Sequence, residues 1–214
     1  METDRRRRWL AGLIGLPVGI AMLARSAHAA APSPARDDRG ASLDAIAARE
    51  AIRDVLYRYA RANDRADEAM MRSCFWPEST HKHGAFDGLS SDFVGYAMKV
   101  HHTIYYSTHF ITNAAVEVNG DRAFSECYYA AHHRRPKAGG TGEEDAFFEG
   151  RYLDFLERRG EEWRIIRRRG LADYTTVMAA ATPYAAWPAG NSHHGPDDEY
   201  FAMRRAFLSK AQGA

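Results

Sequence analysis

Four long segments rich in β-branched and aromatic residues follow one another in the second half of the chain, and they restrict the fold more than any other feature. They cover residues 105–118, 122–135, 147–158 and 163–174. They form two pairs, 105–118 with 122–135 and 147–158 with 163–174. A short glycine-containing turn, Asn-Gly-Asp in the first pair and Arg-Gly-Glu in the second, separates the two segments, and such turns join antiparallel strands. A polar, glycine-rich loop separates the two pairs. The pattern predicts two hairpins in one antiparallel sheet.

Helical periodicity precedes these strands. In residues 42–64, Ala48, Ile52, Leu56 and Ala60 recur at every fourth position, which places them on one face of a helix. Helices followed by a run of strands indicate an α+β fold, with the helices packed on one curved antiparallel sheet.

The remaining elements are expected to be short. The patterns predict a second helix over 67–75, a strand over 80–83 and a loop over 84–88. A third helix is expected from Ser90, which can cap it, to about residue 103. Residues 175–198 contain three prolines and are expected to be irregular, before a C-terminal helix over 199–210.

Residues 1–29 have the features of a secretory signal peptide. Four consecutive arginines precede an apolar run, and the segment ends in Ala-His-Ala, a small-x-small cleavage pattern. The run is shorter than the about 20 residues of a membrane span. Arg-Arg-Arg-Trp-Leu at 6–10 is similar to a twin-arginine signal, with a Sec signal or an uncleaved anchor as alternatives. We therefore expect a periplasmic or exported protein, without membrane attachment after cleavage, in which residues 30–41 are a flexible linker.

Composition restricts the function in a different way. The 214 residues include 29 basic and 28 acidic side chains, for a formal charge of +1, so no nucleic-acid partner is indicated. The sequence contains no glycine fingerprint for phosphates, no Cys-x-x-Cys and no Gly-x-Ser-x-Gly. Export would allow a disulfide, but Cys74 is in a helical segment and Cys127 in a strand, so we expect two buried free thiols.

Asp64 and His109 are the residues whose positions most suggest chemistry. Asp64 continues the apolar i+4 row of the first helix, where burying an unpaired carboxylate costs several kcal/mol. His109 lies in the first long strand, and alternation places on its face Tyr105, Ser107, Ile111 and Asn113. If this face looks at the helices, Asp64 can orient the imidazole of His109 as a general base.

Several segments together resemble the SnoaL-like, nuclear transport factor 2-like superfamily. They are Ala-Ile-Arg-Asp-Val-Leu-Tyr-Arg-Tyr-Ala-Arg-Ala-Asn-Asp at 51–64, Thr-His-Phe-Ile-Thr-Asn at 108–113, the hairpin at 119–123, Gly-Arg-Tyr at 150–152 and Trp-Arg-Ile-Ile-Arg at 163–167. The resemblance covers 42–175 and leaves 176–214 as a C-terminal extension with a helix. It implies a cone-shaped fold, in which three N-terminal helices pack on a curved, mostly antiparallel sheet around an apolar pocket.

The branch with scytalone dehydratase, bile-acid dehydratase and hexachlorocyclohexane dehydrochlorinase consists of cofactor-independent enzymes that eliminate a group from hydrophobic ring compounds. The resemblance assigns their aspartate to Asp64, their histidine to His109, a tyrosine to Tyr59 and an arginine to Arg167. It implies a lyase that acts on a hydrophobic hydroxylated substrate, without metal or cofactor, as a homodimer or homotrimer. The residues expected to contact the substrate are Arg167, Tyr105, Tyr129, Asn113 and Phe148.

Other interpretations stay open. Asp64 is equally able to cap a turn, Tyr59 to pack in the core and Arg167 to lie on a solvated face. His81 and His83 could supply two metal ligands from one side of a strand, but no third ligand is evident. His101 and His133 are further candidates to reach the pocket. The function could instead be that of a ketosteroid-type isomerase, or of a non-catalytic exported binding protein or scaffold subunit.

Overall fold

The computed structural model describes residues 43–187 and 197–211. The helices are α1 (Leu43–Asp64), α2 (Glu68–Arg72), α3 (Ser90–His101) and α4 (Glu199–Ala211), with a 3₁₀ turn at Tyr184–Ala186. The strands are β1 (Phe75–His83), β2 (Phe86–Leu89), β3 (Tyr106–Asn119), β4 (Arg122–Pro136), β5 (Glu143–Arg159) and β6 (Glu162–Ala179). The predicted signal peptide and linker (1–41) lie outside the described residues.

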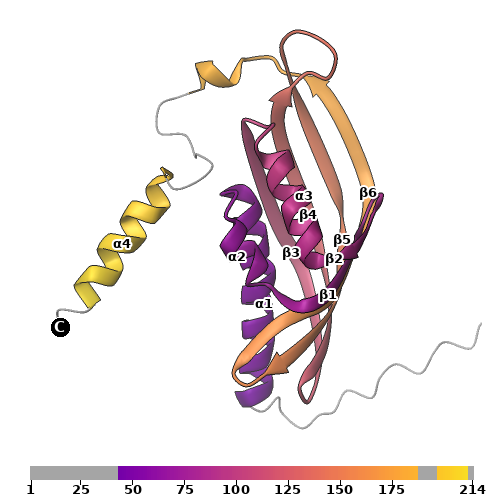
Figure 1. Ribbon diagram of the computed structural model, residues 1–214, viewed down its shortest axis with the longest axis vertical. Coiled ribbons are helices and arrows are strands. Elements are labelled where there is room, and N and C mark those ends of the chain that lie inside the picture. Colours follow the sequence, from indigo (N-terminus) through magenta and orange to yellow (C-terminus); the bar gives the residue numbers. More distant parts are fainter. Residues whose placement is uncertain (1–42, 188–196, 212–214) are drawn as a thin grey trace, which may run out of the picture. The chain divides into compact units, whose positions relative to one another are not determined.

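The six strands form one curved sheet in the order β2-β1-β6-β5-β4-β3 (Figure 1). Every neighbouring pair is antiparallel except β1 and β6, which are parallel. The expected α+β class with a mostly antiparallel sheet is therefore confirmed. Among the helices that the structure describes, none is long and apolar enough to cross a membrane.

The second helix is shorter than predicted because the chain enters the sheet early. It ends at Arg72, and Phe75 already pairs with Ile165 of β6. Pro77 lies inside β1, where the pairing with β6 is irregular between Phe75 and Thr80. A proline is tolerated in a strand at such an irregularity because no ladder hydrogen bond is lost there.

Two segments expected to be irregular are strands. Residues 84–88 were predicted as a loop, but the chain turns at Gly84, with a φ of 56°, and returns along β1 as β2. The positive φ favours glycine at this position. The last strand continues through residue 175 to Ala179, because β5 is long enough to pair with it over this length.

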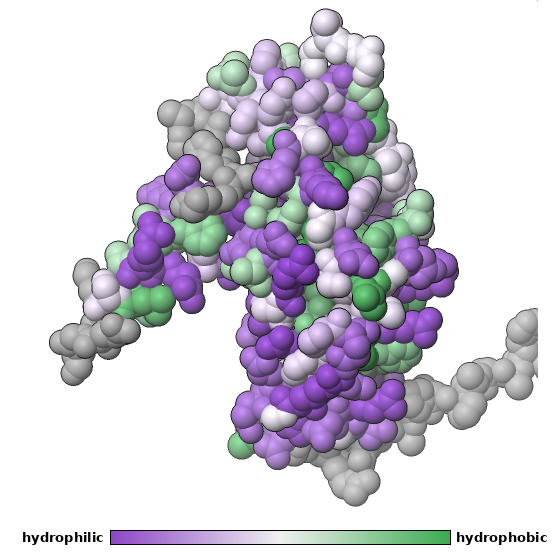
Figure 2. Space-filling model, viewed as in Figure 1, coloured by the Kyte–Doolittle hydropathy of each residue, from purple (hydrophilic) through white to green (hydrophobic). Residues whose placement is uncertain are grey.

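The apolar stripe of α1 is buried, as predicted. Ile52 and Leu56 are 0% and 1% exposed, and burial of each such side chain stabilises the fold by about 1.5–3 kcal/mol. Helices α1 and α3 lie on one face of the sheet, and the opposite side of α1 presents mainly hydrophilic residues (Figures 1 and 2). Cys74 and Cys127 are buried free thiols in this core, which confirms the prediction.

A bulge in β6 decides which arginine of its Arg-Arg-Arg run enters the core. Consecutive residues of β5 pair with Ile165 and Arg167 of β6, so Ile166 is an extra residue. Alternation changes phase at a bulge. As a result Arg168 points toward the helices and is 1% exposed, whereas Arg167 points to solvent.

The buried Arg168 is compensated by Asp154 of β5. Its Nε and Nη2 donate to the two carboxylate oxygens at 2.7 Å each, and both side chains are 0% exposed. The guanidinium carbon also lies 4.1 Å from the ring centre of Tyr59 and 4.4 Å from that of Tyr152. Two-point pairing of this kind is the geometry that best offsets the desolvation of buried ions.

A second bulge, in β3, changes the face of Asn113. Residues 113 and 114 of β3 lie opposite the single residue Cys127 of β4, and Asn113 has a φ of 49°. Before the bulge, His109 faces the helices, and after it Ala114 does. Without the bulge, alternation would direct Asn113 toward the helices and Ala114 away from them. The bulge reverses this, so that Ala114 continues the inner face of β3.

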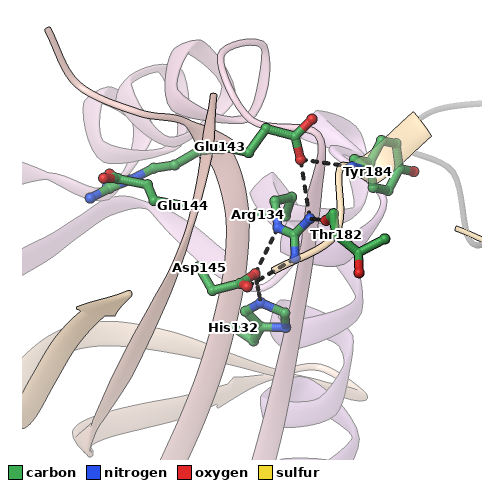
Figure 3. Close-up of polar contacts among 8 residues, drawn as sticks. His132, Arg134, Glu143, Glu144, Asp145, Thr182 and Tyr184 are labelled. Atoms are coloured by element: carbon green, nitrogen blue, oxygen red, sulfur yellow. Dashed lines mark hydrogen bonds and ion pairs between the residues drawn. The ribbon is translucent and has the colours of Figure 1, made fainter. Parts of the chain in front are cut away.

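The chain beyond β6 is held against the outer side of β4 by Arg134 (Figure 3). Its Nη1 donates to the carbonyl oxygen of Thr182 at 2.6 Å and to Glu143 at 3.1 Å. The same Glu143 oxygen accepts a hydrogen bond from the backbone N–H of Tyr184 at 2.7 Å. The Nε and Nη2 atoms of Arg134 donate to the two carboxylate oxygens of Asp145 at 2.7 and 2.9 Å. These bonds tie the start of the C-terminal extension to the sheet.

We predict that Asp154→Asn destabilises the protein by about 3–5 kcal/mol, because it leaves the charge of Arg168 buried without a counterion. Urea unfolding measures the difference. The matched control is Asp121→Asn, which removes the exposed partner of Arg158 and should change the free energy of unfolding little. Equal effects of the two substitutions would show that the buried pair contributes no more than an exposed one.

His81 gives a second prediction. Burial, and then the charge of Arg168, lowers its pKa to about 2, against about 6.5 in the unfolded chain. The unfolded state therefore binds more protons below pH 6.5, and stability falls as the pH drops through this range. Between pH 7 and pH 5 the wild type should lose about 2 kcal/mol more than His81→Phe. Parallel stability curves for the two proteins would contradict this assignment.

Candidate active site

Helix α1 and strand β3 bring Asp64 and His109 into contact. Asp64 is the last residue of α1, and its Oδ1 lies 2.7 Å from Nδ1 of His109. The backbone N–H of His109 donates to Oδ2 at 3.2 Å, so both carboxylate oxygens hold the same residue. The side chains are 14% and 10% exposed. The structure thus shows that the face of β3 that carries His109 looks at the helices, which is the condition under which Asp64 and His109 were expected to meet.

This contact determines the tautomer of His109. An ionised carboxylate only accepts hydrogen bonds, so Nδ1 carries the proton and the lone pair is on Nε2. The additional bond from the backbone restricts the orientation of the ring relative to Asp64. The arrangement can accept a proton at Nε2 and stabilise the resulting imidazolium through Asp64.

His109 lies at the wall of a cavity of about 590 Å³, within the range typical of small-molecule sites. Helices α1 and α3 and the inner face of the sheet enclose it. The aromatic residues of its wall are Tyr59, Phe86, Phe93, Tyr96, Tyr129, Phe148 and Tyr152. Three residues predicted for the site, Tyr59, Tyr129 and Phe148, are therefore part of the pocket.

Polar side chains gather around His109. His101 and His133, both candidates from the sequence, line the pocket together with Asn63. The ring of His133 is 5.4 Å from that of His109, and Nε2 of His101 is 3.2 Å from Oδ1 of Asn63. Burial, followed by the proximity of His109, lowers the pKa of His133 to about 3, so its imidazole is neutral at neutral pH.

His81 and His83 occupy the same inner side of β1, with parallel rings 6.1 Å apart. Only His83 belongs to the pocket wall, whereas His81 packs on Phe93 at 3.6 Å. Within the described part of the chain, no group of three or more His, Cys, Asp or Glu side chains is arranged to bind a metal ion.

Three residues expected to contact the substrate lie elsewhere, and these predictions are wrong. Arg167 points to solvent because of the bulge at Ile166. Asn113 is exposed at the bulge in β3, where its backbone conformation rather than its side chain is used. Tyr105 is 43% exposed and stacks on Tyr184 at 5.8 Å, because it precedes β3.

Sequence reasoning missed Asn63 and much of the aromatic wall, and it also missed or only partly anticipated Arg168 and His133. Arg168, beneath the ring of Tyr59, takes the inward position expected of Arg167, and no local sequence pattern reveals a bulge. His133 follows Tyr129 by four residues in β4, so alternation places both on one face. That signal was sufficient to predict that His133 lines the pocket.

Comparison with known proteins agrees with this architecture. The type 2 hexachlorocyclohexane dehydrochlorinase is 22% identical, with a TM-score of 0.59 over 70% of this chain and 99% of that chain. A scytalone dehydratase-like protein from Novosphingobium aromaticivorans is 18% identical, with a TM-score of 0.55 over 69% and 97%. A nuclear transport factor 2-like superfamily protein from Salmonella enterica is 19% identical, with a TM-score of 0.50 over 67% and 99%. At these identities the similarities establish the fold.

The sequence also matches a family model directly. Residues 44–169 match the SnoaL-like domain, which is more than half of the chain and extends from α1 into β6. No curated protein matches the sequence significantly. The match includes Asp64, His109 and most of the pocket wall, and the chain belongs to the SnoaL-like domain family.

Proposed function

We propose that this protein is a cofactor-independent lyase, which eliminates a group from a hydrophobic, hydroxylated aromatic or polycyclic substrate. The observation that carries the proposal is the 2.7 Å contact between Asp64 and His109 at the wall of an aromatic pocket. The names of two proteins with this fold, a dehydrochlorinase and a scytalone dehydratase-like protein, support the same class of reaction.

In this reaction Nε2 of His109 removes a proton from a carbon of the substrate. The electron pair of the broken C–H bond forms a double bond, and the adjacent C–O or C–halogen bond breaks with its electrons on the leaving group. A departing hydroxide takes a proton and leaves as water, whereas a halide leaves as the anion. In a retro-aldol variant the base removes the hydroxyl proton of a hydroxymethyl group, the electrons of the O–H bond form the C=O bond of formaldehyde, the C–C bond breaks, and the electron pair left on the other carbon takes the proton back from the imidazolium. Asp64 stabilises the imidazolium, and such acid–base catalysis contributes about 10²–10⁴-fold.

We assign to Tyr59 and His133, which line the pocket together with His109, the binding of the oxygen on which negative charge develops. Burial raises the pKa of Tyr59, so its phenol remains protonated and is a donor at neutral pH. The low pKa of His133 keeps its imidazole neutral, with one donor and one acceptor. Preorganised donors in a desolvated pocket stabilise a developing oxyanion without adding a full charge to the ground state.

Two alternatives to the lyase differ in what happens to the bound molecule. A ketosteroid-type isomerase would return the proton to another carbon, so product and substrate would have equal mass. A non-catalytic binding protein or scaffold subunit would bind a ligand and convert nothing. The proposal includes a hydrophobic small molecule as the partner, a homodimer or homotrimer as the assembly, and export as the cellular route.

We predict that His109→Ala and Asp64→Asn each lower kcat/KM by about 10²–10⁴-fold, because both remove proton transfer by a correctly oriented imidazole. The purified protein is incubated with hydroxylated steroids and lignin-type aromatic diols without added metal or cofactor. New conjugated products are followed by ultraviolet absorbance and mass.

The matched control is His132→Ala. His132 forms a similar contact with Asp145, at 2.6 Å, but on the outer side of β4. This variant should keep wild-type turnover. Activity that survives His109→Ala would overturn the mechanism, and products of unchanged mass would favour the isomerase.

Tyr59→Phe should lower kcat by about 10²-fold with little change in KM, because it removes one donor to the developing oxyanion. Steady-state kinetics on the best substrate of the panel measure the effect, and circular dichroism verifies the fold. An unchanged kcat would assign Tyr59 to packing against Arg168 and Tyr152 alone.

A further inference from the structure

Tyr96 belongs to the stripe of α3 that faces the pocket, and yet it is exposed. Phe93, Tyr96, Ala97 and Val100 recur at helical spacing, and all of them line the cavity that contains His109. Phe93 and Ala97 are each 7% exposed, whereas Tyr96 is 56% exposed. Because the inner stripe of a helix is ordinarily covered, the exposure of Tyr96 marks a place where the described part of the chain leaves the pocket open to solvent.

Small residues form the rest of this opening. Besides Tyr96, the exposed residues of the described pocket wall are Gly84 and Ala85, in the turn between β1 and β2, and Ala172 and Thr175 of β6. The ring of Tyr96 therefore supplies the largest apolar surface that an entering molecule meets. Exposed apolar surface at the rim of a groove is a common mark of a ligand site.

Two further rings connect Tyr96 with the core of the protein. Phe86 of β2, which lies beside α3 (Figure 1), stacks against it, with the ring centres 6.3 Å apart and the planes at 24°. Phe93 lies 6.2 Å from Tyr96 and 5.3 Å from Phe86, so the three rings contact one another pairwise. Phe93 in turn stacks on His81 at 3.6 Å. The ring of Tyr96 is thus the outer member of an aromatic cluster that continues from the mouth into the wall of the pocket.

The chemistry of the wall favours an uncharged aromatic ring. Among the described residues that line the pocket there is no aspartate, glutamate, lysine or arginine. Burial, followed by the charge of Arg168, lowers the pKa of His83 to about 4, and burial, followed by the proximity of His109, lowers that of His133 to about 3, so both imidazoles are uncharged at neutral pH. An ionic group would lose its hydration in this pocket without gaining a counterion. An aromatic ring gains ring–ring contacts that a saturated ring of the same size lacks.

We propose that Tyr96, together with Phe86 and Phe93, forms a binding subsite for an aromatic ring at the mouth of the pocket. An uncharged aromatic ring of the substrate stacks on Tyr96, and the reacting group contacts His109, which lines the same cavity of about 590 Å³. The subsite selects aromatic compounds over saturated polycyclic compounds of the same size, a choice that the proposed function leaves open. This inference rests on the proposed function for the reacting group only, and binding alone tests the subsite.

The test compares two probes, 2-naphthalenemethanol and its saturated counterpart decahydro-2-naphthalenemethanol, by titration calorimetry at pH 7.5. The probes have the same carbon skeleton and hydroxyl group, and we expect the wild type to prefer the aromatic one. Tyr96→Leu, which keeps an apolar side chain without a ring, should lower the ratio of the two affinities about fivefold, within the range found for aromatic ring pairs. Tyr96→Phe should preserve the ratio. The matched control, Phe155→Leu, removes a ring that is 46% exposed and contacts Phe124 on the outer face of the sheet, and it should also preserve the ratio.

Nuclear magnetic resonance of the wild type provides a readout that does not depend on the folding of a variant. In protein labelled with ¹³C-tyrosine, the ring signals of Tyr96 should move upfield when the aromatic probe stacks on them, and much less with the saturated probe, which has no ring current. The signals of Tyr57, which is 45% exposed on α1 and outside this pocket wall, should not move. Stationary Tyr96 signals at saturation, an affinity ratio unchanged by Tyr96→Leu, or binding of neither probe would each overturn the proposal. Failure of the proposed function appears separately, as turnover that survives His109→Ala.

Discussion

Arg168 and Asp154 form an ion pair between α1 and the sheet, with no exposed surface on either side chain. Desolvation of two ions is costly, so the pair is tolerated only with both carboxylate oxygens engaged. The rings of Tyr59 and Tyr152 cover the guanidinium on the pocket side. Because Asp154 and Arg168 are directly opposite each other, the pair fixes the register of β5 and β6. It also holds the rings of Tyr59 and Tyr152 in the pocket wall.

The same cation shapes the electrostatics of the pocket. Burial, and then the charge of Arg168, lowers the pKa of His81 and His83. These imidazoles therefore stay neutral at a pH low enough to protonate a free histidine side chain. Burial has the same effect on His133. We therefore assign proton transfer in the proposed reaction to His109, which Asp64 orients at the pocket wall, whereas His81, His83 and His133 are neutral.

Local irregularities of the sheet supply the shape of the site. The bulges in β3 and β6 change which residues face the helices, and each does so at a point where simple alternation would have directed a different side chain inward. Gly170 makes room for His83, and Gly150 makes room for Tyr129, whose hydroxyl would lie 2.7 Å from an added Cβ. The two bulges and the two glycines thus determine which polar and aromatic side chains reach the cavity.

The sequence by itself determined the α+β class, the apolar stripe of α1, both hairpins and the place of Asp64 on the inner row of α1, and it left open which face of the sheet His109 occupies. These depend on periodicity and turn residues, which act over a few neighbours and are visible in one segment at a time. Only the tertiary structure decided that β1 pairs in parallel with β6, that Arg168 rather than Arg167 enters the core, and that His83 and His133 share one pocket. Strand pairing and bulges depend on contacts between distant segments, and a shift of one residue reverses the face of every side chain that follows.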